Sequence, residues 1–222
     1  MNILAIDTTA DIESVAILKD GEVPCARSLK QRSTAAEVLT SEIEKIMSDQ
    51  GLEFSDLDAI AVTRGPASFT SVRIGLACAK GLALATNKQL MSFDSLLVQA
   101  YNYRDFQGRI IVINDAKMDE FFVASFICDG NNLQEEKKSY LATIGNLSDI
   151  EVKEGDLVVG SGAKQLLLAN SIIEGNIKVA DENGEQILAE SLAHMAFNCQ
   201  DQGVLDLSPN YIRDPKIGKR KK

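Results

Sequence analysis

The stretch GPASFTSVRIGLACAKGLAL, residues 65–84, is a glycine–proline turn that leads into a helical pattern with almost no polar face. Only Arg73 and Lys80, seven positions apart, form a polar stripe, which Ala77 and Leu84 share. A helix that is apolar on nearly all sides is buried on nearly all sides, whereas the outer helices of a layered α/β protein keep one face in water. The pattern therefore predicts that another protein covers this helix. The alternative is that the sheet and the neighbouring helices cover it.

The start of the same helix offers hydroxyl groups and free backbone N–H groups, which together attract anions. Ser68 and Thr70 supply the hydroxyls, but the run is not a Walker loop because it lacks the GxxxxGK[ST] pattern. Either residue acting as the helix N-cap explains the hydroxyls without a ligand. Asp7, Thr8 and Thr9 follow the first apolar strand pattern and have two similar interpretations. In the first, their backbone N–H groups and hydroxyls face an anion and the carboxylate holds a metal-bound water. In the second, the aspartate caps a tight turn by bonding to its own backbone.

Outside this stretch, the chain repeats one order of elements. The first half predicts strands at 2–7, 14–19 and 22–29, a helix at 33–51, a strand at 58–63, the helix described above, a strand near 88–93 and a helix at 95–102. The second half predicts a strand at 109–115, a returning hairpin at 119–130, a strand at 156–161, a helix at 164–174, a strand at 177–180 and a helix at 185–200. An Asp-Gly pair marks a hairpin in each half. The repeat predicts an α/β fold of two duplicated halves, residues 1–105 and 106–222, each a mixed sheet with flanking helices.

Composition and charge limit the function. The 222-residue chain carries 23 Lys and Arg against 32 Asp and Glu, and its net charge of −9 argues against binding nucleic acid on its own. A single histidine, His194, cannot build a zinc or iron site with two imidazoles, so we expect no metal site. The N-terminus has no secretion-signal pattern and no apolar run reaches transmembrane length. We therefore expect a cytoplasmic protein that does not bind membranes.

Five runs of residues occur in the order seen in the TsaB (YeaZ-like) family: ILAIDTT, AEVL, GPASFTSVRIGLACAKGLAL, NDAKMDEFF and SPNYIRDPK. The chain resembles this family over most of its length. The resemblance implies a fold similar to TsaD and to the actin, sugar-kinase and Hsp70 superfamily, with ribonuclease H-like halves. It also implies a role in making N6-threonylcarbamoyladenosine beside the anticodon of tRNA. In that reaction TsaD transfers the threonylcarbamoyl group, TsaE is an ATPase, and the TsaB-like protein is a non-catalytic scaffold.

The chain departs from the family pattern at positions that bear on ligand binding. The family loop usually reads GPGSFTG, and here Ala67 and Ser71 replace its two inner glycines, so each added Cβ narrows the approach of a ligand to the backbone. Lys117 stands where the family has an arginine, which removes any planar bidentate contact. We therefore expect no cofactor and no catalytic residue. The candidate vestigial nucleotide-binding group comprises Asp7, Thr8, Thr9, Ser68 and Thr70.

The resemblance places the partner surface on the helices at about 33–50 and 70–86, which in the family meet TsaD or a second TsaB. The expected interface residues are Ala36, Leu39, Ile43, Val72, Arg73, Leu76, Ala77 and Lys80. Their apolar members would supply contact area, and the two basic residues would set the orientation through rim ion pairs. The expected partners are TsaD and TsaE, together with a homodimer built on a self-complementary helix pair. tRNA would be contacted only through the complex.

Two further hypotheses stay open on the sequence. The first is an ATP-binding or phosphotransferase enzyme of the actin and sugar-kinase superfamily, which would use the Asp7 run and the 65–70 loop. The second is direct contact with tRNA through the basic end at 216–222, although such charge runs are usually solvated tails.

Overall fold

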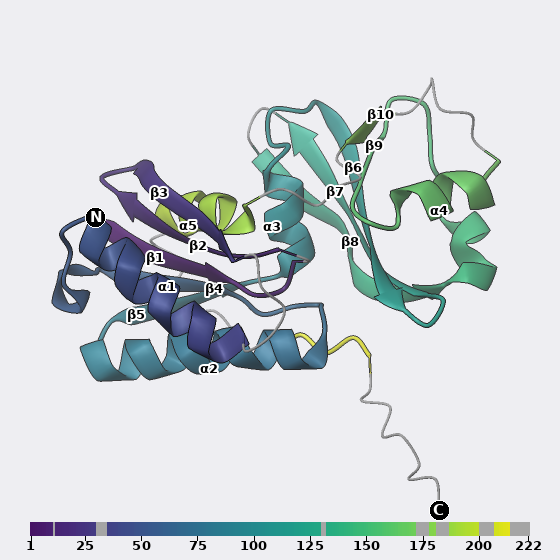
Figure 1. Cartoon of the computed structure of the whole chain (residues 1–222). Coiled ribbons are helices and arrows are strands. Elements are labelled where there is room, and N and C mark those ends of the chain that lie inside the picture. The colour runs from purple at the N-terminus through teal and green to yellow at the C-terminus, as the bar shows by residue number, and fades with distance from the viewer. Residues whose placement is uncertain are drawn as a thin grey trace, which may run out of the picture.

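The computed structural model describes residues 1–10, 12–29, 35–129, 132–171, 178–180, 187–199 and 207–213, with only the backbone at 35–37, 178 and 180. Within these ranges the strands form two five-stranded mixed sheets (Figure 1). The first sheet has the order β3-β2-β1-β4-β5, in which β1 runs antiparallel to β2 and parallel to β4. Its strands are β1 (Asn2–Asp7), β2 (Glu13–Lys19), β3 (Glu22–Leu29), β4 (Ala59–Thr63) and β5 (Gln89–Phe93).

The second sheet repeats the first. Its order is β10-β9-β6-β7-β8, so that β6 takes the place of β1, with an antiparallel neighbour on one side and a parallel neighbour on the other. Its strands are β6 (Gly108–Lys117), β7 (Glu120–Asp129), β8 (Asn132–Thr143), β9 (Leu157–Val159) and β10 (Lys178–Ala180). The predicted α/β fold of two duplicated halves is confirmed.

Helices cover both faces of the first sheet because its central strands are apolar on both sides. Ile3 and Ala5 of β1 face one cluster of the core, which α5 completes, and Leu4 and Ile6 face the other, which α1 and α2 complete. This alternation follows from the two-residue period of a strand. The helices are α1 (Ala35–Asp49), α2 (Phe69–Thr86), α3 (Ser95–Tyr101), α4 (Ala163–Ala169) and α5 (Leu188–Asn198), with 3₁₀ turns η1 (Phe54–Asp56) and η2 (Ile144–Asp149).

Two helices join the halves. Helix α3 contributes Val98 to the core of the first sheet and Leu96 and Ala100 to the core of the second. Helix α5 follows the second sheet in the chain but packs on the first, where Leu192 and Ala196 are fully buried. The predicted division at residue 105 stays a prediction. The structure adds that α5, from the second half of the sequence, packs on the first sheet.

One strand was missing from the sequence prediction. Strand β8 carries the polar run Gln134–Lys138 and its residues there are exposed, because it forms an edge of the second sheet. Its charges hid the alternation that marks a half-buried strand. In the first half, Asp20 and Gly21 both have positive φ, 53° and 90°, which confirms the Asp-Gly hairpin turn. Helix α4 ends at Ala169, earlier than predicted.

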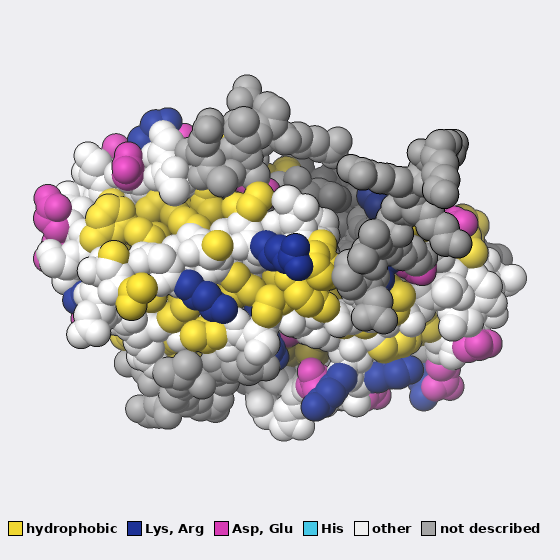
Figure 2. All heavy atoms as spheres, turned by 90° about the horizontal axis from the view of Figure 1, so that it is seen from below, with side chains coloured by type: hydrophobic (Ala, Val, Ile, Leu, Met, Phe, Trp, Pro, Cys, Tyr) yellow, Lys and Arg dark blue, Asp and Glu magenta, His cyan; other side chains and the backbone are white. Residues whose placement is uncertain are grey.

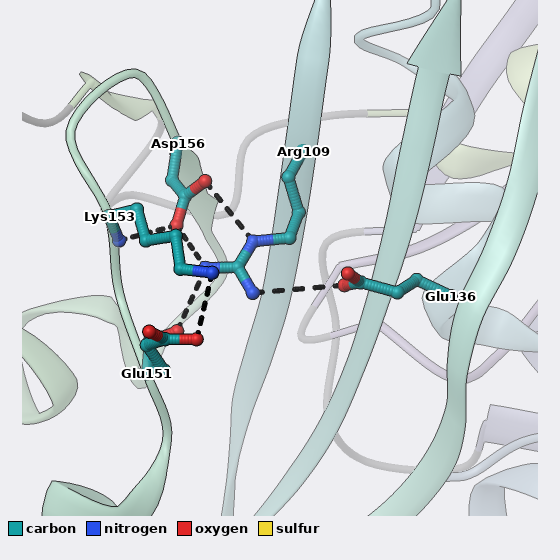
Figure 3. A network of polar contacts seen from close by, with 5 residues as sticks. All are labelled: Arg109, Glu136, Glu151, Lys153 and Asp156. Atoms are coloured by element: carbon teal, nitrogen blue, oxygen red, sulfur yellow. Dashed lines mark hydrogen bonds and ion pairs between the residues drawn. The ribbon is translucent and has the colours of Figure 1, made fainter.

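A buried ion pair holds the second sheet at the end where β6 and β9 begin (Figure 3). The Arg109 guanidinium donates from Nε to Asp156 Oδ1 at 3.1 Å and from a terminal nitrogen to Oδ2. The same nitrogen donates to the Glu151 backbone carbonyl at 2.9 Å, and the Lys153 backbone N–H donates to Asp156 Oδ2 at 2.7 Å. Glu136 of β8 lies 3.8 Å from the guanidinium. The network therefore ties the 151–156 loop to the sheet.

Candidate functional site

Helix α2 starts at a tightly packed turn. The Ser68 hydroxyl accepts a hydrogen bond from the Ser71 backbone N–H at 3.2 Å, so Ser68 is the N-cap. Ser95, at the start of α3, donates to the Pro66 carbonyl at 2.8 Å, and its backbone N–H donates to Gly65 at the same distance. Thr70 is exposed on the first turn of the helix. These contacts give the hydroxyl of Ser68 a structural role, as one of the two sequence interpretations predicted.

Asp7 is fully buried at the end of β1. Its Oδ1 accepts hydrogen bonds from the hydroxyls of Thr63 at 2.6 Å and Thr9 at 2.5 Å and from the Thr9 N–H at 3.1 Å, while Oδ2 accepts the Ala10 N–H at 3.4 Å. Burial raises the pKa of Asp7, and these hydrogen bonds oppose that rise. Thr8 is buried too and donates to the Ser71 carbonyl at 2.7 Å. The carboxylate thus closes a turn, as the capping interpretation predicted.

A cavity of about 500 Å³ lies between the two halves. The turn after β1, the start of α2, α3, the end of β6 and residues 210–213 line it. Thr9 and Ser68 of the candidate nucleotide group reach this cavity, whereas Asp7, Thr8 and Thr70 do not line it. The structure therefore does not bring all five to one cavity, and nucleotide binding by this group stays a prediction. Tight packing directs two of these side chains into the protein, and the helical period turns Thr70 outward.

The basic residues at this cavity have acidic partners. Lys117 Nζ lies 3.0 Å from Asp115 Oδ2, and Arg213 Nε lies 2.8 Å from Glu120 Oε2. Partial burial acts most strongly on Asp115 and favours its neutral form, but the hydrogen bonds and the charge of Lys117 outweigh it, so the pKa of Asp115 is lowered. Both cations are therefore at least partly neutralised before any anionic ligand arrives.

The turn GSGAKQ, residues 160–165, resembled a nucleotide-contacting loop in sequence. Gly160 has φ +104°, and a Cβ there would lie 2.4 Å from the Ile113 carbonyl oxygen. The Ser161 hydroxyl accepts the backbone N–H of Asp115 at 3.0 Å. Close packing of this strand-to-helix connection on β6 thus accounts for the glycine without a ligand.

His194 lines a second, smaller cavity beside Arg104 and Glu190. Burial, followed by the positive charge of Arg104, lowers the pKa of His194. Across the parts of the chain that the structure describes, no three His, Cys, Asp or Glu side chains gather closely enough to hold a metal ion. Within the same parts, no helix combines the length and the apolar character needed to cross a membrane.

The outer face of α2 is the second candidate site. After the exposed Thr70 of the first turn, its exposed residues combine small or apolar side chains with two basic ones: Arg73, Ala77, Lys80, Gly81, Leu84 and Ala85. Leu84 is 86% exposed. Figure 2 views the molecule from this side, and hydrophobic side chains there surround basic ones. Among the residues that the structure describes, the sheet and its neighbouring helices leave these side chains exposed.

The structure corrects half of the predicted interface set. Leu39 and Ile43 of α1 and Val72 and Leu76 of α2 are buried in the core between these helices and the sheet. They cannot contact a partner on the outer face, because the helical period turns them inward. Arg73, Ala77 and Lys80 are exposed, and the side chain of Ala36 lies outside the described residues. Leu84, seven positions after Ala77, was missing from the predicted set although the same spacing indicated it.

Sequence reasoning also missed the surroundings of Arg73. Its guanidinium lies over the Phe69 ring, 4.2 Å from the centroid, and its Nε donates to the Tyr211 hydroxyl at 3.1 Å. The two rings stack with centroids 4.0 Å apart. The run SPNYIRDPK carried the only signal, since it matched the family pattern without indicating where it would lie.

Comparisons with known proteins agree on the family. Residues 29–200 match the family model "TsaD: tRNA N6-adenosine threonylcarbamoyltransferase". The TsaB protein of Escherichia coli K12 is 35% identical over 135 residues, which cover 60% of this chain and 58% of that protein. The chain thus spans little more than half the length of that relative.

Solved structures give the same fold. YeaZ from Pseudomonas aeruginosa superposes with a TM-score of 0.77 at 23% identity, covering 95% of this chain and 99% of the other. The ROK hexokinase of Thermus thermophilus reaches 0.50 at 11% identity, covering 91% and 100%. The fold is therefore that of the actin and sugar-kinase superfamily. With a family model matched over most of its length, this chain belongs to the TsaD family and, within it, to the TsaB (YeaZ-like) proteins.

Proposed function

We propose that this chain takes part in forming N6-threonylcarbamoyladenosine in tRNA as a non-catalytic scaffold. In this proposal it binds TsaD through the outer face of α2, and TsaE joins the assembled pair. The names of the TsaB relatives and the matched TsaD family model support the pathway. The surface of α2 supports the mode of action.

The exposed face of α2 carries the proposal. Ala77 and Gly81 leave little bulk on this face, so a partner helix can approach closely, and Leu84 projects 86% exposed beside them. Fully burying a leucine side chain contributes about 1.5–3 kcal/mol. Arg73 and Lys80 flank these residues and would orient an acidic partner surface and speed its association. A partner would thus cover what the chain itself leaves open.

The cavity between the halves supports a non-catalytic role. Asp7, the carboxylate at the end of the first strand, is turned into the core, and the cations Lys117 and Arg213 each have an acidic partner. A phosphoryl-transfer site needs exposed groups that hold a metal ion and the phosphates. Within the described residues, the lining of this cavity is largely apolar, its polar side chains are mostly hydroxyls and amides, and its one carboxylate, Asp115, pairs with Lys117.

The test is the variant Ala77→Arg. A bulky charge at the centre of the exposed face should abolish the complex with purified TsaD, measured by light scattering after size exclusion. The thermal unfolding curve should not change, because Ala77 is exposed. The matched control is Leu168→Arg on α4, an apolar position that is 79% exposed in the other half and should retain binding. TsaD binding by Ala77→Arg at the wild-type affinity would refute this interface.

The same face would serve a homodimer, since a helix pair can be self-complementary. We expect the isolated wild-type chain to show a dimer that Ala77→Arg converts to a monomer. A dimer that persists in this variant would place self-association on another surface.

The ATP-binding or phosphotransferase hypothesis is the second candidate, because the cavity of about 500 Å³ lies between two halves of a kinase-like fold. Calorimetry of the isolated chain with ATP and magnesium tests it directly. Micromolar binding with turnover would favour it over the scaffold. We expect neither.

Direct tRNA contact through the basic end concerns residues 216–222, which lie outside the described residues. Deleting 217–222 and measuring the tRNA affinity of the assembled complex at fixed salt would test it. An unchanged affinity is expected if tRNA is contacted only by the other subunits.

A further inference from the structure

The segment Leu207–Arg213, here called the strap, crosses the cavity between the halves. On the first half, the Asn210 N–H donates to the Arg64 carbonyl at 2.7 Å, and its side-chain amide donates to Asp94 Oδ2 at 2.7 Å. The Tyr211 ring stacks on Phe69 with an interplanar angle of 12°. The strap is therefore anchored to the turn that precedes α2 and to the N-cap of α3.

The same segment is anchored to the second half. The Asn210 amide donates to the Ser139 hydroxyl of β8 at 3.2 Å, and that hydroxyl donates to Asp94 at 2.8 Å. Arg213 donates to the Ala116 carbonyl of β6 at 2.9 Å and forms its ion pair with Glu120 of β7. Both members of that ion pair are more than four-fifths buried. The seven-residue strap thus makes hydrogen bonds or ion pairs with both halves of the protein.

We propose that the strap is a clasp that fixes the two halves against each other and positions Arg73 on the partner-binding face of α2. The part of this proposal that concerns a partner rests on the proposed function. Tyr211 is the link, because its ring stacks on Phe69 and its hydroxyl accepts the hydrogen bond from Arg73. Arg73 is a positioned residue on the outer face, and Tyr211 is the positioning residue that holds it from the strap.

The size of the effect that the strap can have on partner binding follows from its aromatic contact. An aromatic pair shifts an equilibrium by about two- to tenfold. If the closed strap sets Arg73 for binding, partner binding must in turn stabilise the closed strap by the same factor. The position of the strap in the cavity and partner binding at the outer face of α2 would then be thermodynamically coupled.

The test of the clasp is hydrogen–deuterium exchange of the full chain, followed by mass spectrometry. Tyr211→Ala removes the aromatic contact of the strap with the first half, and Arg213→Ala removes its ion pair with the second half, while the hydrogen bonds of Asn210 remain. We expect both variants to raise exchange by about threefold or more in peptides from both halves, 64–72 and 113–122. Tyr211→Phe retains the stack and should exchange like the wild type. Faster exchange confined to the strap, or to the half that the changed residue contacts, would overturn the clasp.

The test of the link to the partner face is TsaD affinity. Tyr211→Ala should weaken binding by about two- to tenfold, and Tyr211→Phe, which loses only the hydrogen bond to Arg73, should weaken it less. Wild-type affinity in Tyr211→Ala would overturn the positioning role. If the wild-type chain itself fails to bind TsaD, the proposed function fails, and the exchange experiment still decides the clasp. Tyr211 is 38% exposed, so we expect its variants to fold, which circular dichroism checks.

Discussion

The two halves share a strand order but differ in the use of the aspartate at the end of the leading strand. Asp7, which ends β1, is fully buried and accepts four hydrogen bonds. Asp115, near the end of β6, is one-third exposed and pairs with Lys117 at the cavity. The repeat has therefore preserved the topology without preserving the environment of these carboxylates. Fold and site chemistry are separable in this molecule.

The second half buries its carboxylate at the opposite end of the sheet. Asp156 pairs with Arg109 where β9 and β6 begin, away from the cavity (Figure 3). Asp7 in the first half and Asp156 in the second are thus both buried carboxylates whose hydrogen bonds hold the structure together.

The helices that follow β4 and β9 differ as well. Helix α2 has 18 residues and an open apolar face, whereas α4 has seven. A helix of two turns offers little surface for a partner helix. This difference is why we propose the partner surface on the first half.

The largest effect on stability should come from Asp156→Ala. It leaves the largely buried guanidinium of Arg109 without its main partner, and we expect a loss of about 3 kcal/mol in the free energy of unfolding, measured with urea. Glu136→Ala removes a more exposed partner 3.8 Å from the same group and should cost less than about 1 kcal/mol. Equal losses would mean that the buried pair has no special role.

The pair of strand-end aspartates should give the next largest difference. Asp7→Ala leaves the buried Thr63 hydroxyl and the Thr9 N–H without an acceptor, and we expect a loss of about 2 kcal/mol in urea unfolding. Asp7→Asn keeps an acceptor oxygen and removes a carboxylate whose pKa burial raises, so it should cost less. Asp115→Ala should cost less than about 1 kcal/mol. If Asp115→Ala proved the more damaging, the contrast between the halves would be wrong.

Two glycines of α2 should have opposite effects when changed to alanine. A Cβ at position 75 would lie 2.4 Å from Thr8 Oγ1, so Gly75→Ala should destabilise the protein by about 1–2 kcal/mol. At Gly81 nothing lies within 4 Å, so Gly81→Ala should stabilise it by up to about 1 kcal/mol through helix propensity. Thermal unfolding measures both. A stabilising Gly75→Ala would show that α2 is not pressed against the end of β1.

The smallest effect concerns pH. Because burial lowers the pKa of His194, the unfolded state binds more protons than the folded state between the folded pKa and the unfolded value of about 6.5. The histidine therefore contributes stability above that window, which is lost as the pH falls through it. Between pH 7 and pH 5 the wild type should lose more stability in urea than His194→Gln does. Since the chain has one histidine, identical pH profiles would contradict the lowered pKa.

The element order and several local features followed from the sequence because they depend on neighbouring residues. Apolar periods predicted the helices and most strands, Asp20-Gly21 predicted its hairpin, and Ser68 was one of two predicted caps. The strand β8 did not follow, since its exposed face is charged. The sequence listed Asp7 and Thr8 beside Ser68 and Thr70 as candidates, and the tertiary packing showed that Asp7 and Thr8 are buried.

Tertiary structure alone decided which face of α2 is exposed. The stripe of Arg73 and Lys80 marked one side of the helix, but the apolar residues on the other sides gave no further signal. That Val72 and Leu76 are core residues followed only from their packing against the sheet. The tertiary structure also placed the strap beside α2, because the contact of Tyr211 with Arg73 joins residues 138 positions apart. The sequence by itself determined the family, the repeated order of strands and the amount of apolar surface. Local patterns specify local geometry, whereas contacts between distant residues exist only after the chain has folded.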